Sequence, residues 1–314
     1  MTPRRDRTDP DGTRGVAEGR PARLAIGVVG TGRVGSVLGA ALIQAGHRVV
    51  AGYGVSVASR QRANALLPGV PLVTPAEVMR RSDLVLLAVP DDVLLGLVEG
   101  LVATEAVRPG QLLAHTSGRF GTAVLQAATR AGALPLAVHP VMTFTGTPVD
   151  LERLAGAMFG VTAPEPLWPV AEALVVEMGA EPVRIAEEHR TLYHAALAHG
   201  SNHLMTLIAD AMDLLRQAGV AEPDRTLGPL LSAALDNVLR QGDAALTGPV
   251  ARGDAGTVSD HVAAIDRAAP ETVTAYVAMA RRTAARALAS GRLRPADAEP
   301  LLDALAHRPD EARH

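Results

Sequence analysis

The first strongly apolar segment of the chain, residues 24–29, is followed at once by glycines at Gly30, Gly32 and Gly35. Such a run is typical of a strand buried on both faces of a parallel sheet, and a helix of small residues is predicted after it, over 34–45. Gly30 permits a tight turn, Gly32 lets the backbone approach a pyrophosphate, and Gly35 lets the helix pack closely on the strand. This order predicts a dinucleotide-binding unit, with the pyrophosphate on the N–H groups that open the helix; a glycine-rich turn without a ligand is the alternative. The expected contacts are Gly30, Thr31, Gly32, Arg33, Val34 and Gly35.

The apolar pattern then alternates between short runs and helical periods up to residue 186. Predicted strands cover 47–51, 71–73, 83–89, 111–115, 134–140, 158–162 and 181–185, and predicted helices cover 59–66, 75–80 and 166–178. The alternation indicates an α/β fold, with an N-terminal Rossmann domain over 22–186 built on a doubly wound, mainly parallel sheet. Several strands end in proline or polar residues, and ligands bind beyond the carboxyl ends of parallel strands. Val89-Pro90, 115–118 and His139-Pro140 are therefore expected to line the same crevice as the glycines.

The pattern changes at Glu187, after which no further strand is predicted. Helices are expected over 187–218, 223–241, 257–268 and 271–290 and after Pro295, with a glycine-rich loop over 242–256. We therefore predict an all-helical substrate and dimerisation domain over 187–306, with a cleft between the domains. The long first helix is rich in Ala, Leu and Met on more than one face, which favours a homodimer through the helices. Residues 1–21 are predicted to be a disordered tail, and 307–314 a second tail.

The composition excludes several classes of catalytic chemistry. The 314 residues contain no Cys and no Lys, and the net charge is −3. Thiolate catalysis, zinc-thiolate sites and lysine Schiff bases are therefore excluded, and nothing favours nucleic acid or an anionic membrane as partner. No His, Asp and Glu cluster has metal-site spacing, so no metal is expected. Without a signal peptide or a membrane-spanning run, the expected location is the cytoplasm.

The residues after the second predicted strand indicate which cofactor is preferred. No Asp or Glu lies between Gly35 and Glu77, where NAD enzymes place an acid for the ribose 2′-hydroxyl. The segment instead contains Ser56, Ser59, Arg60 and Arg62, of which Ser59 and Arg60 are the expected contacts. Arginine binds phosphate bidentately, so this segment predicts NADP(H). The alternative is that Arg60 and Arg62 are solvated helix residues.

Hydride transfer requires a group that donates a hydrogen bond or a proton to the substrate oxygen. On the long helix, Arg190, His194 and Ser201 share one face, with Asn202 beside it. We expect His194 to protonate an oxyanion and Asn202 to hydrogen-bond it. Ordinary surface or interface roles are the alternative for the histidine.

Three further residues are candidates for this small-molecule site. His139 closes a buried strand and is predicted to face the pocket or to be structural. Ser117 is predicted to bond the nicotinamide or the substrate, or else to cap the next helix. Arg252 lies in a loop with Gly248 and Gly253 and is predicted to hold a substrate carboxylate, or else to pair with Asp254 and fix the turn.

These segments together resemble a known family, the Rossmann-like proteins with a C-terminal domain of unknown function, DUF2520. The resemblance covers about residues 22–290. Its motifs are Gly30-Thr-Gly-Arg-Val-Gly35, Ala88-Val-Pro-Asp91, His115-Thr-Ser-Gly118, His139-Pro140 with Thr143-Phe144, Tyr193-His194 through Ser201-Asn202, and Gly248-Pro-Val-Ala-Arg-Gly-Asp254.

The architecture is similar to that of 6-phosphogluconate dehydrogenase-like enzymes, which implies an NADP-binding domain and a helical dimerisation domain. Some members of the family are ketopantoate reductases, so the resemblance implies NADPH-dependent reduction of a small oxo acid, best 2-dehydropantoate to pantoate for pantothenate biosynthesis. An imine or deazaflavin-coupled reductase, or a non-catalytic NADP-binding regulatory protein, is the alternative. The better-known relatives use a lysine on the long helix. Here Arg190 or His194 lies in the corresponding neighbourhood, and His194 or His139 is the expected acid.

Overall fold

The computed structural model describes residues 23–306, so both predicted tails lie outside the described residues. The chain divides into two compact units, Met1–Leu197 and Ala198–His314. This division falls inside a long helix, whereas the sequence pattern places the domain boundary at the start of that helix, after residue 186. The assignment of separate cofactor and substrate domains stays a prediction.

The first unit is built on a seven-stranded sheet in the order β2-β1-β3-β4-β5-β6-β7. Strands β1 to β5 are parallel, β6 is antiparallel to β5, and β7 is parallel to β6. This confirms the predicted Rossmann fold with a mainly parallel sheet. The strand predicted over 71–73 is reduced to an isolated bridge between Gly52 and Leu72. The strands are β1 (Ala25–Val29), β2 (Arg48–Tyr53), β3 (Leu84–Leu87), β4 (Leu112–His115), β5 (Leu134–Pro140), β6 (Met158–Thr162) and β7 (Glu181–Arg184).

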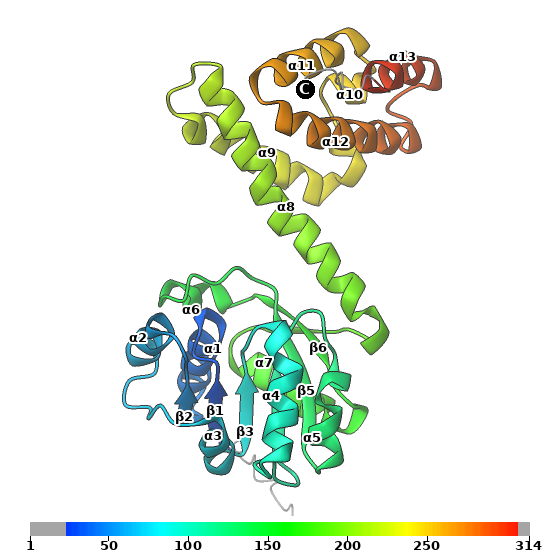
Figure 1. Cartoon of the computed structure of the whole chain (residues 1–314). Helices are drawn as coiled ribbons and strands as arrows, with labels where there is room; N and C mark the ends of the chain where they lie inside the picture. Colours follow the sequence, from blue (N-terminus) through cyan, green and yellow to red (C-terminus); the bar gives the residue numbers. More distant parts are fainter. Residues whose placement is uncertain (1–22, 307–314) are drawn as a thin grey trace, which may run out of the picture. The chain divides into compact units, whose positions relative to one another are not determined.

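Helices cover both faces of this sheet, because successive side chains of a strand point to opposite faces. In β3, Leu84 and Leu86 join the apolar cluster that includes α1 and α7. Val85 and Leu87 join the cluster that includes α3, α4 and α5. Figure 1 shows α4 and α5 over one face of the strands. The helices are α1 (Arg33–Gln44), α2 (Val57–Leu66), α3 (Pro75–Arg81), α4 (Asp91–Ala103), α5 (Gln126–Arg130), α6 (Val149–Leu154) and α7 (Trp168–Glu177), with short 3-10 helices η1 (Thr122–Leu125) and η2 (Glu165–Leu167).

The described part of the second unit is helical, as predicted, and its core lies among α10 to α13. The loop predicted over 242–256 is wrong, because η4 and α10 lie inside it. Gly248 and Gly253 have φ values of 94° and 76°, which only glycine adopts easily, and they turn the chain on either side of α10. The elements after β7 are η3 (Glu187–His189), α8 (Arg190–Gln217), α9 (Pro223–Gln241), η4 (Gly242–Ala245), α10 (Pro249–Arg252), α11 (Ala255–Ala268), α12 (Pro270–Ala289) and α13 (Pro295–Ala306).

Helix α8 begins in the first unit and continues into the second. Of its 28 residues, Arg190 is the one that is buried. Over residues 23–306, no helix has the length and apolar character that crossing a membrane requires.

Candidate functional site

The glycine-rich turn between β1 and α1 has the geometry that the sequence predicts. Gly30 has φ +99°, and its N–H and that of Thr31 both donate to the carbonyl of Tyr53 at 2.9 Å. A Cβ at Gly35 would lie 2.1 Å from the carbonyl oxygen of Gly30, so only glycine lets the helix start this close to the strand. A Cβ at Gly32 would have no neighbour within 4 Å, and no side chain caps α1. The helix N-terminus is therefore open to an anion.

Basic side chains lie beside this turn. Arg33, at the start of α1, and Arg62, on α2, both pack against Gly146, where a Cβ would lie 3.0 Å and 2.8 Å from their stems. Asp150 fixes that loop by accepting the N–H groups of Thr145 at 2.8 Å and Gly146 at 2.7 Å. The side chains of Arg33 and Arg62 therefore meet at the loop around Gly146, and Arg33 itself is the first residue of α1.

The predicted contacts on α2 differ in their environment. Ser59 is buried, and its hydroxyl donates to the carbonyl of Ser56 at 2.8 Å. The Ser56 hydroxyl caps α2 by accepting the N–H of Ser59. Arg60 is exposed. Of the two predicted contacts in this segment, Arg60 thus has its charged group toward solvent, while the hydroxyl of Ser59 is already used inside the turn.

The ends of β3 and β4 adjoin the same edge of the sheet. A Cβ at Gly30 would lie 3.1 Å from a methyl group of Val89, and Pro90 immediately precedes α4. Ser117 is buried and its hydroxyl accepts the N–H of Phe120 at 3.1 Å, so it shapes its own loop. Helix η1 begins after this loop, and it is Glu187 rather than Ser117 that accepts N–H groups there.

The side chain of His115 also fixes the loop that follows β4. Its Nε2 donates to the carbonyl of Gly121 at 2.9 Å, and its Nδ1 accepts the N–H of Ser117 at 3.2 Å. Burial lowers the pKa of His115 to about 4, so the ring is neutral at pH 7. Both ring nitrogens are occupied, which makes His115 a structural residue of the site.

The predicted candidates His139 and His194 meet beside Gly118. The rings of the two histidines lie 5.9 Å apart, edge to face. A Cβ at Gly118 would lie 2.6 Å from Cδ2 of His194 and 2.8 Å from Nε2 of His139. A glycine is therefore required where the loop after β4 passes these rings.

Tyr193 completes this group, which we call the donor cluster (His139, Tyr193 and His194). Its hydroxyl lies 2.8 Å from Nδ1 of His139. A Cβ at Gly160 would lie 2.3 Å from the same hydroxyl, so β6 also needs a glycine here. The sequence names Tyr193 only as part of a motif. The contact was not predicted because it joins a strand and a helix that are 54 residues apart along the chain.

The electrostatics of the donor cluster keep two of its members, His139 and Tyr193, as neutral hydrogen-bonding groups. Burial, together with His194 and Arg190, lowers the pKa of His139 to about 4. Burial raises the pKa of Tyr193, although Arg190 partly opposes this. At pH 7 the imidazole of His139 is neutral, and the phenol keeps its proton. His139 can therefore donate a hydrogen bond but is not a standing imidazolium acid.

Asn202 and Arg252 belong to the second compact unit, and both are exposed. Among the described residues, Arg252 has no carboxylate within 4.0 Å, so the ion pair with Asp254 is not formed. Asp254 instead caps α11 by accepting the N–H of Thr257 at 3.1 Å. The binding roles of Asn202 and Arg252 stay predictions.

The comparisons with known proteins agree with this architecture. Residues 8–140 match the Rossmann-like domain, and residues 157–283 match the domain of unknown function DUF2520. The chain is a Rossmann-like protein with a DUF2520 domain. In this protein the DUF2520 segment begins just before β6 and includes Tyr193 and His194, whereas His139 and Gly118 lie in the Rossmann-like segment. The donor cluster is thus assembled from both segments.

No curated protein matches the sequence, but solved structures share the fold. A Bacteroides fragilis protein described as a candidate NADP oxidoreductase is 21% identical, with a TM-score of 0.69 over 83% of this chain and 98% of that chain. An imine reductase from a Pseudomonas species is 20% identical, with a TM-score of 0.63 over 90% and 100% of the two chains. A reductive aminase from Aspergillus terreus, in complex with NADPH and ethyl-5-oxohexanoate, is 17% identical, with a TM-score of 0.62 over 86% and 95%. At these identities the likeness establishes the fold.

Proposed function

We propose that this protein is an NADP(H)-dependent reductase of a small carbonyl compound, and that an oxo acid is its substrate. The observation that carries the proposal is the convergence of His139, Tyr193 and His194 beside Gly118. This donor cluster lies at the edge of the sheet where parallel strands end, the edge that also holds the open glycine turn.

The residues of the turn fit a dinucleotide phosphate. The uncapped N-terminus of α1 and the open space at Gly32 would accept the pyrophosphate. Arg33, Arg60 and Arg62 would hold a 2′-phosphate, which favours NADPH over NADH. When bound, NADPH supplies the hydride that reduces the carbonyl carbon. Two of the similar structures name NADP or NADPH, which supports this choice.

The donor cluster would supply the proton that the substrate oxygen takes up during reduction. We assign the Tyr193 hydroxyl as donor to Nδ1 of His139, which leaves the ring proton on Nε2, the nitrogen nearest Gly118. Nε2–H then hydrogen-bonds the substrate oxygen and releases its proton as that oxygen becomes negative. Nδ1 of His139 takes the hydroxyl proton of Tyr193, and water then returns a proton to the tyrosine oxygen. His194 is the second donor to the same oxygen.

The substrate we test first is ketopantoate. For this substrate the sequence predicts a carboxylate contact by Arg252 and a carbonyl contact by Asn202, and both stay predictions. An imine is the second candidate, because an imine reductase and a reductive aminase share the fold.

The assay follows NADPH absorbance with ketopantoate, other oxo acids and cyclic imines, and repeats each reaction with NADH. We expect turnover of an oxo acid with NADPH, and His139→Asn and His194→Asn to lower kcat/KM by about 100-fold. His189→Asn is the matched control, because His189 is exposed just before α8 and should keep full activity. Turnover of imines alone would assign the second candidate. Tight NADPH binding without any turnover would favour the non-catalytic regulatory protein.

A separate variant tests the cofactor site. Gly32→Ala has space for its methyl group in the protein, so we expect an unchanged Tm but NADPH binding weaker by roughly tenfold or more, about 1.4 kcal/mol. Unchanged NADPH affinity would place the pyrophosphate away from this turn.

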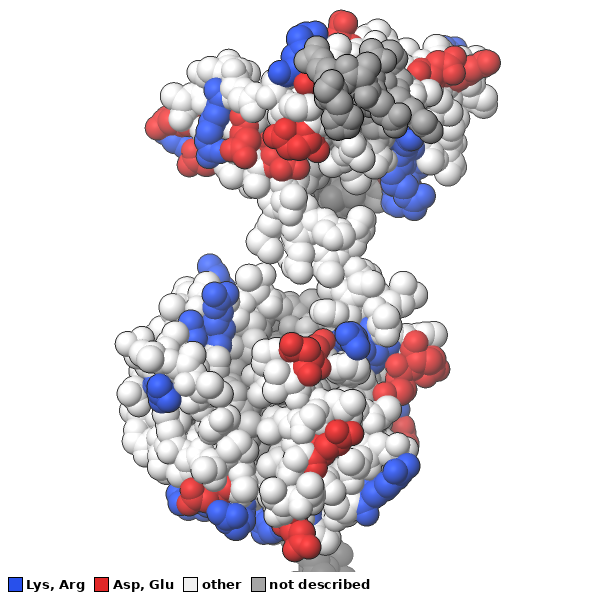
Figure 2. Space-filling model, in the orientation of Figure 1, with Lys and Arg blue, Asp and Glu red and all other residues white. Residues whose placement is uncertain are grey.

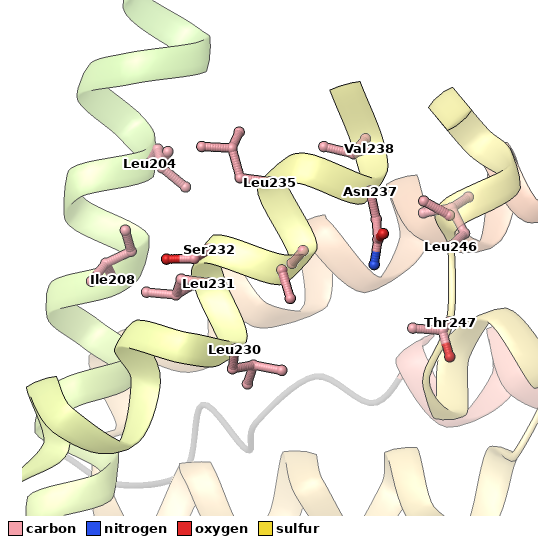
Figure 3. A pocket seen from close by; sticks show the side chains of 13 residues that line it. Leu204, Ile208, Leu230, Leu231, Ser232, Leu235, Asn237, Val238, Leu246 and Thr247 are labelled. Carbon is pink, nitrogen blue, oxygen red and sulfur yellow. The ribbon is translucent and has the colours of Figure 1, made fainter. Parts of the chain in front are cut away.

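We also propose that two copies associate through α8 and α9. From Thr191 to Ala209, α8 contains no Asp, Glu or Arg, and the middle of this helix carries neither blue nor red atoms in Figure 2. In the helical unit, α8 and α9 border an apolar groove of about 580 Å³. Figure 3 shows Leu204 and Ile208 of α8 facing the side of α9 that carries Leu231 and Leu235. A long uncharged apolar surface without a complementary charge pattern suits a second copy of itself.

Sedimentation analysis tests this association. We expect a dimer for the wild type and a monomer for Leu204→Glu. Leu302→Glu is the matched control, because Leu302 is a similarly exposed leucine on α13, with 42% exposure against 38% for Leu204. A wild type that stays monomeric at all concentrations would contradict the proposal.

A further inference from the structure

The first residue of α8, Arg190, has a guanidinium buried beneath the donor cluster. Its side chain is 1% exposed. Nε donates to the hydroxyl of Thr162 at 2.7 Å, and one terminal nitrogen donates to the carbonyls of Ala137 and Gly160, both at 3.0 Å. Ala137 lies on β5 and the other two partners on β6, so Arg190 joins the helix to two strands.

These bonds connect the members of the donor cluster. Ala137 is two positions before His139 on β5. Tyr193 and His194 follow Arg190 by three and four positions, which places them one turn further along the same side of α8. Gly160, which accepts from Arg190, also packs against the Tyr193 hydroxyl. A shift of Arg190 would therefore move both helix donors relative to the strand donor.

The guanidinium is not neutralised by a partner among the described residues. Within residues 23–306, no carboxylate lies within 4.0 Å of it, and its second terminal nitrogen, Nη1, is buried without a hydrogen-bond partner. Its bonds go to a hydroxyl and to carbonyl groups. A buried unpaired charge is costly, and burial lowers the pKa of Arg190 to about 10, which still leaves it charged at pH 7. Such a cost is typical of a functional site rather than of simple packing.

We propose that Arg190 is a positioning residue for the reduction: its buried guanidinium docks the first turn of α8 on β5 and β6, and so sets Tyr193 and His194 against His139. The proposal rests on the proposed reductase function. It differs from that function in assigning a role to a residue that does not touch the substrate.

The charge of Arg190 adds to this positioning. Its guanidinium carbon lies 5.7 Å from the centre of the Tyr193 ring. A positive charge there favours proton release from the phenol and disfavours an imidazolium on His139, so it directs the proton from Tyr193 through His139. The other groups that act on His139 are His194 on α8, His115 on β4 and Asp91 at the start of α4.

Two replacements separate the two contributions. Arg190→Lys keeps the charge but cannot form the three bonds of the guanidinium, so we expect kcat to fall by about 100-fold with KM nearly unchanged. Arg190→Gln also removes the charge, so the pKa of His139 should rise above about 4, although burial and His194, the larger causes, still hold it below its ordinary value. NMR titration of labelled histidines follows this pKa without substrate, and His139→Asn assigns the resonance. Arg130→Gln, which removes an exposed charge from the same unit, should change neither quantity.

The outcomes are distinguishable from failure of the reductase function. If no substrate is reduced, the reductase function fails, while the titration still measures whether Arg190 acts on His139. A wild-type kcat in Arg190→Lys would overturn the positioning proposal, and an unmoved His139 titration in a folded Arg190→Gln would overturn the added contribution of the charge. If Arg190→Gln does not fold, the kinetics of Arg190→Lys decide between the roles. A rise in KM with an unchanged kcat would also overturn the positioning proposal.

Discussion

The two ends of α8 have opposite surroundings although they belong to one continuous helix. The first turn is held by the sheet: Arg190 is buried, and Tyr193 reaches His139. Beyond Leu197, where the second compact unit begins, the described part of the helix has no buried residue, and Leu204 and Met205 are exposed at 38% and 54%.

This difference shows how one element serves two purposes. The first turn uses polar groups in fixed geometry, which suits proton transfer. The remainder offers uncharged apolar surface, which suits association with a partner. Changes in the first turn should therefore affect activity, and changes further along should affect assembly or stability.

The largest effect should come from disturbing the contact between the first turn of α8 and β6. A methyl group in Gly160→Ala would meet the Tyr193 hydroxyl at 2.3 Å and its ring carbon at 2.6 Å. We expect stability to fall by about 1–3 kcal/mol through overpacking and kcat to fall by about 100-fold through the displaced phenol. Thermal unfolding and the NADPH assay measure both.

Gly200→Ala is the matched control for this prediction. Gly200 lies in the exposed part of α8 and has no atom within 4 Å of a Cβ position. Alanine should stabilise the helix there by up to about 1 kcal/mol and leave kcat unchanged. If both glycine variants have the same effect, the contrast between the two ends of α8 does not hold.

The sequence allowed prediction of the features that depend on local pattern. The strands β1 to β7 and the helix α8 were predicted because their apolar runs are long enough to have a clear period. The glycine turn was predicted because Gly30 and Gly35 have a strict spacing. In contrast, α10 spans only Pro249–Arg252 and has no measurable period.

The donor cluster was only partly predictable, for a physical reason. His139 was a candidate because it ends a strand, and His194 because it lies on the long helix. Their meeting depends on tertiary packing through Gly118 and Gly160, which leaves no mark on either local pattern. The role of Ser59 shows the same limit, because its hydroxyl is already bonded to the backbone of Ser56.

The pH dependence of stability tests whether the buried rings of His115 and His139 are kept neutral in the folded protein. The folded-state pKa values of His115 and His139, both about 4, lie below the ordinary value of 6.5. Below pH 6.5 the unfolded chain binds protons that the folded protein does not, so stability falls as the pH drops from 6.5 toward 4. Each ring would contribute at most roughly 3 kcal/mol over that window.

Urea unfolding at several pH values measures this slope. We expect the free energy of unfolding to change less steeply with pH in His139→Asn. The His189→Asn control should match the wild type. An unchanged slope in His139→Asn would mean that this ring is not kept neutral by its surroundings.

The smallest effect concerns the second unit and separates a structural role from a binding role. Asp254 caps α11, accepting both the N–H of Thr257 and, at 2.8 Å, its hydroxyl proton. Asp254→Ala should therefore cost about 1 kcal/mol of stability. Arg252 is exposed and forms no ion pair with the described carboxylates, so Arg252→Ala should change stability by less than about 0.5 kcal/mol. If Arg252→Ala instead raises KM for an oxo acid and leaves Tm unchanged, the predicted carboxylate contact gains support. An equal loss of stability in the two variants would mean that the pair fixes the turn and that Arg252 is not available to a substrate.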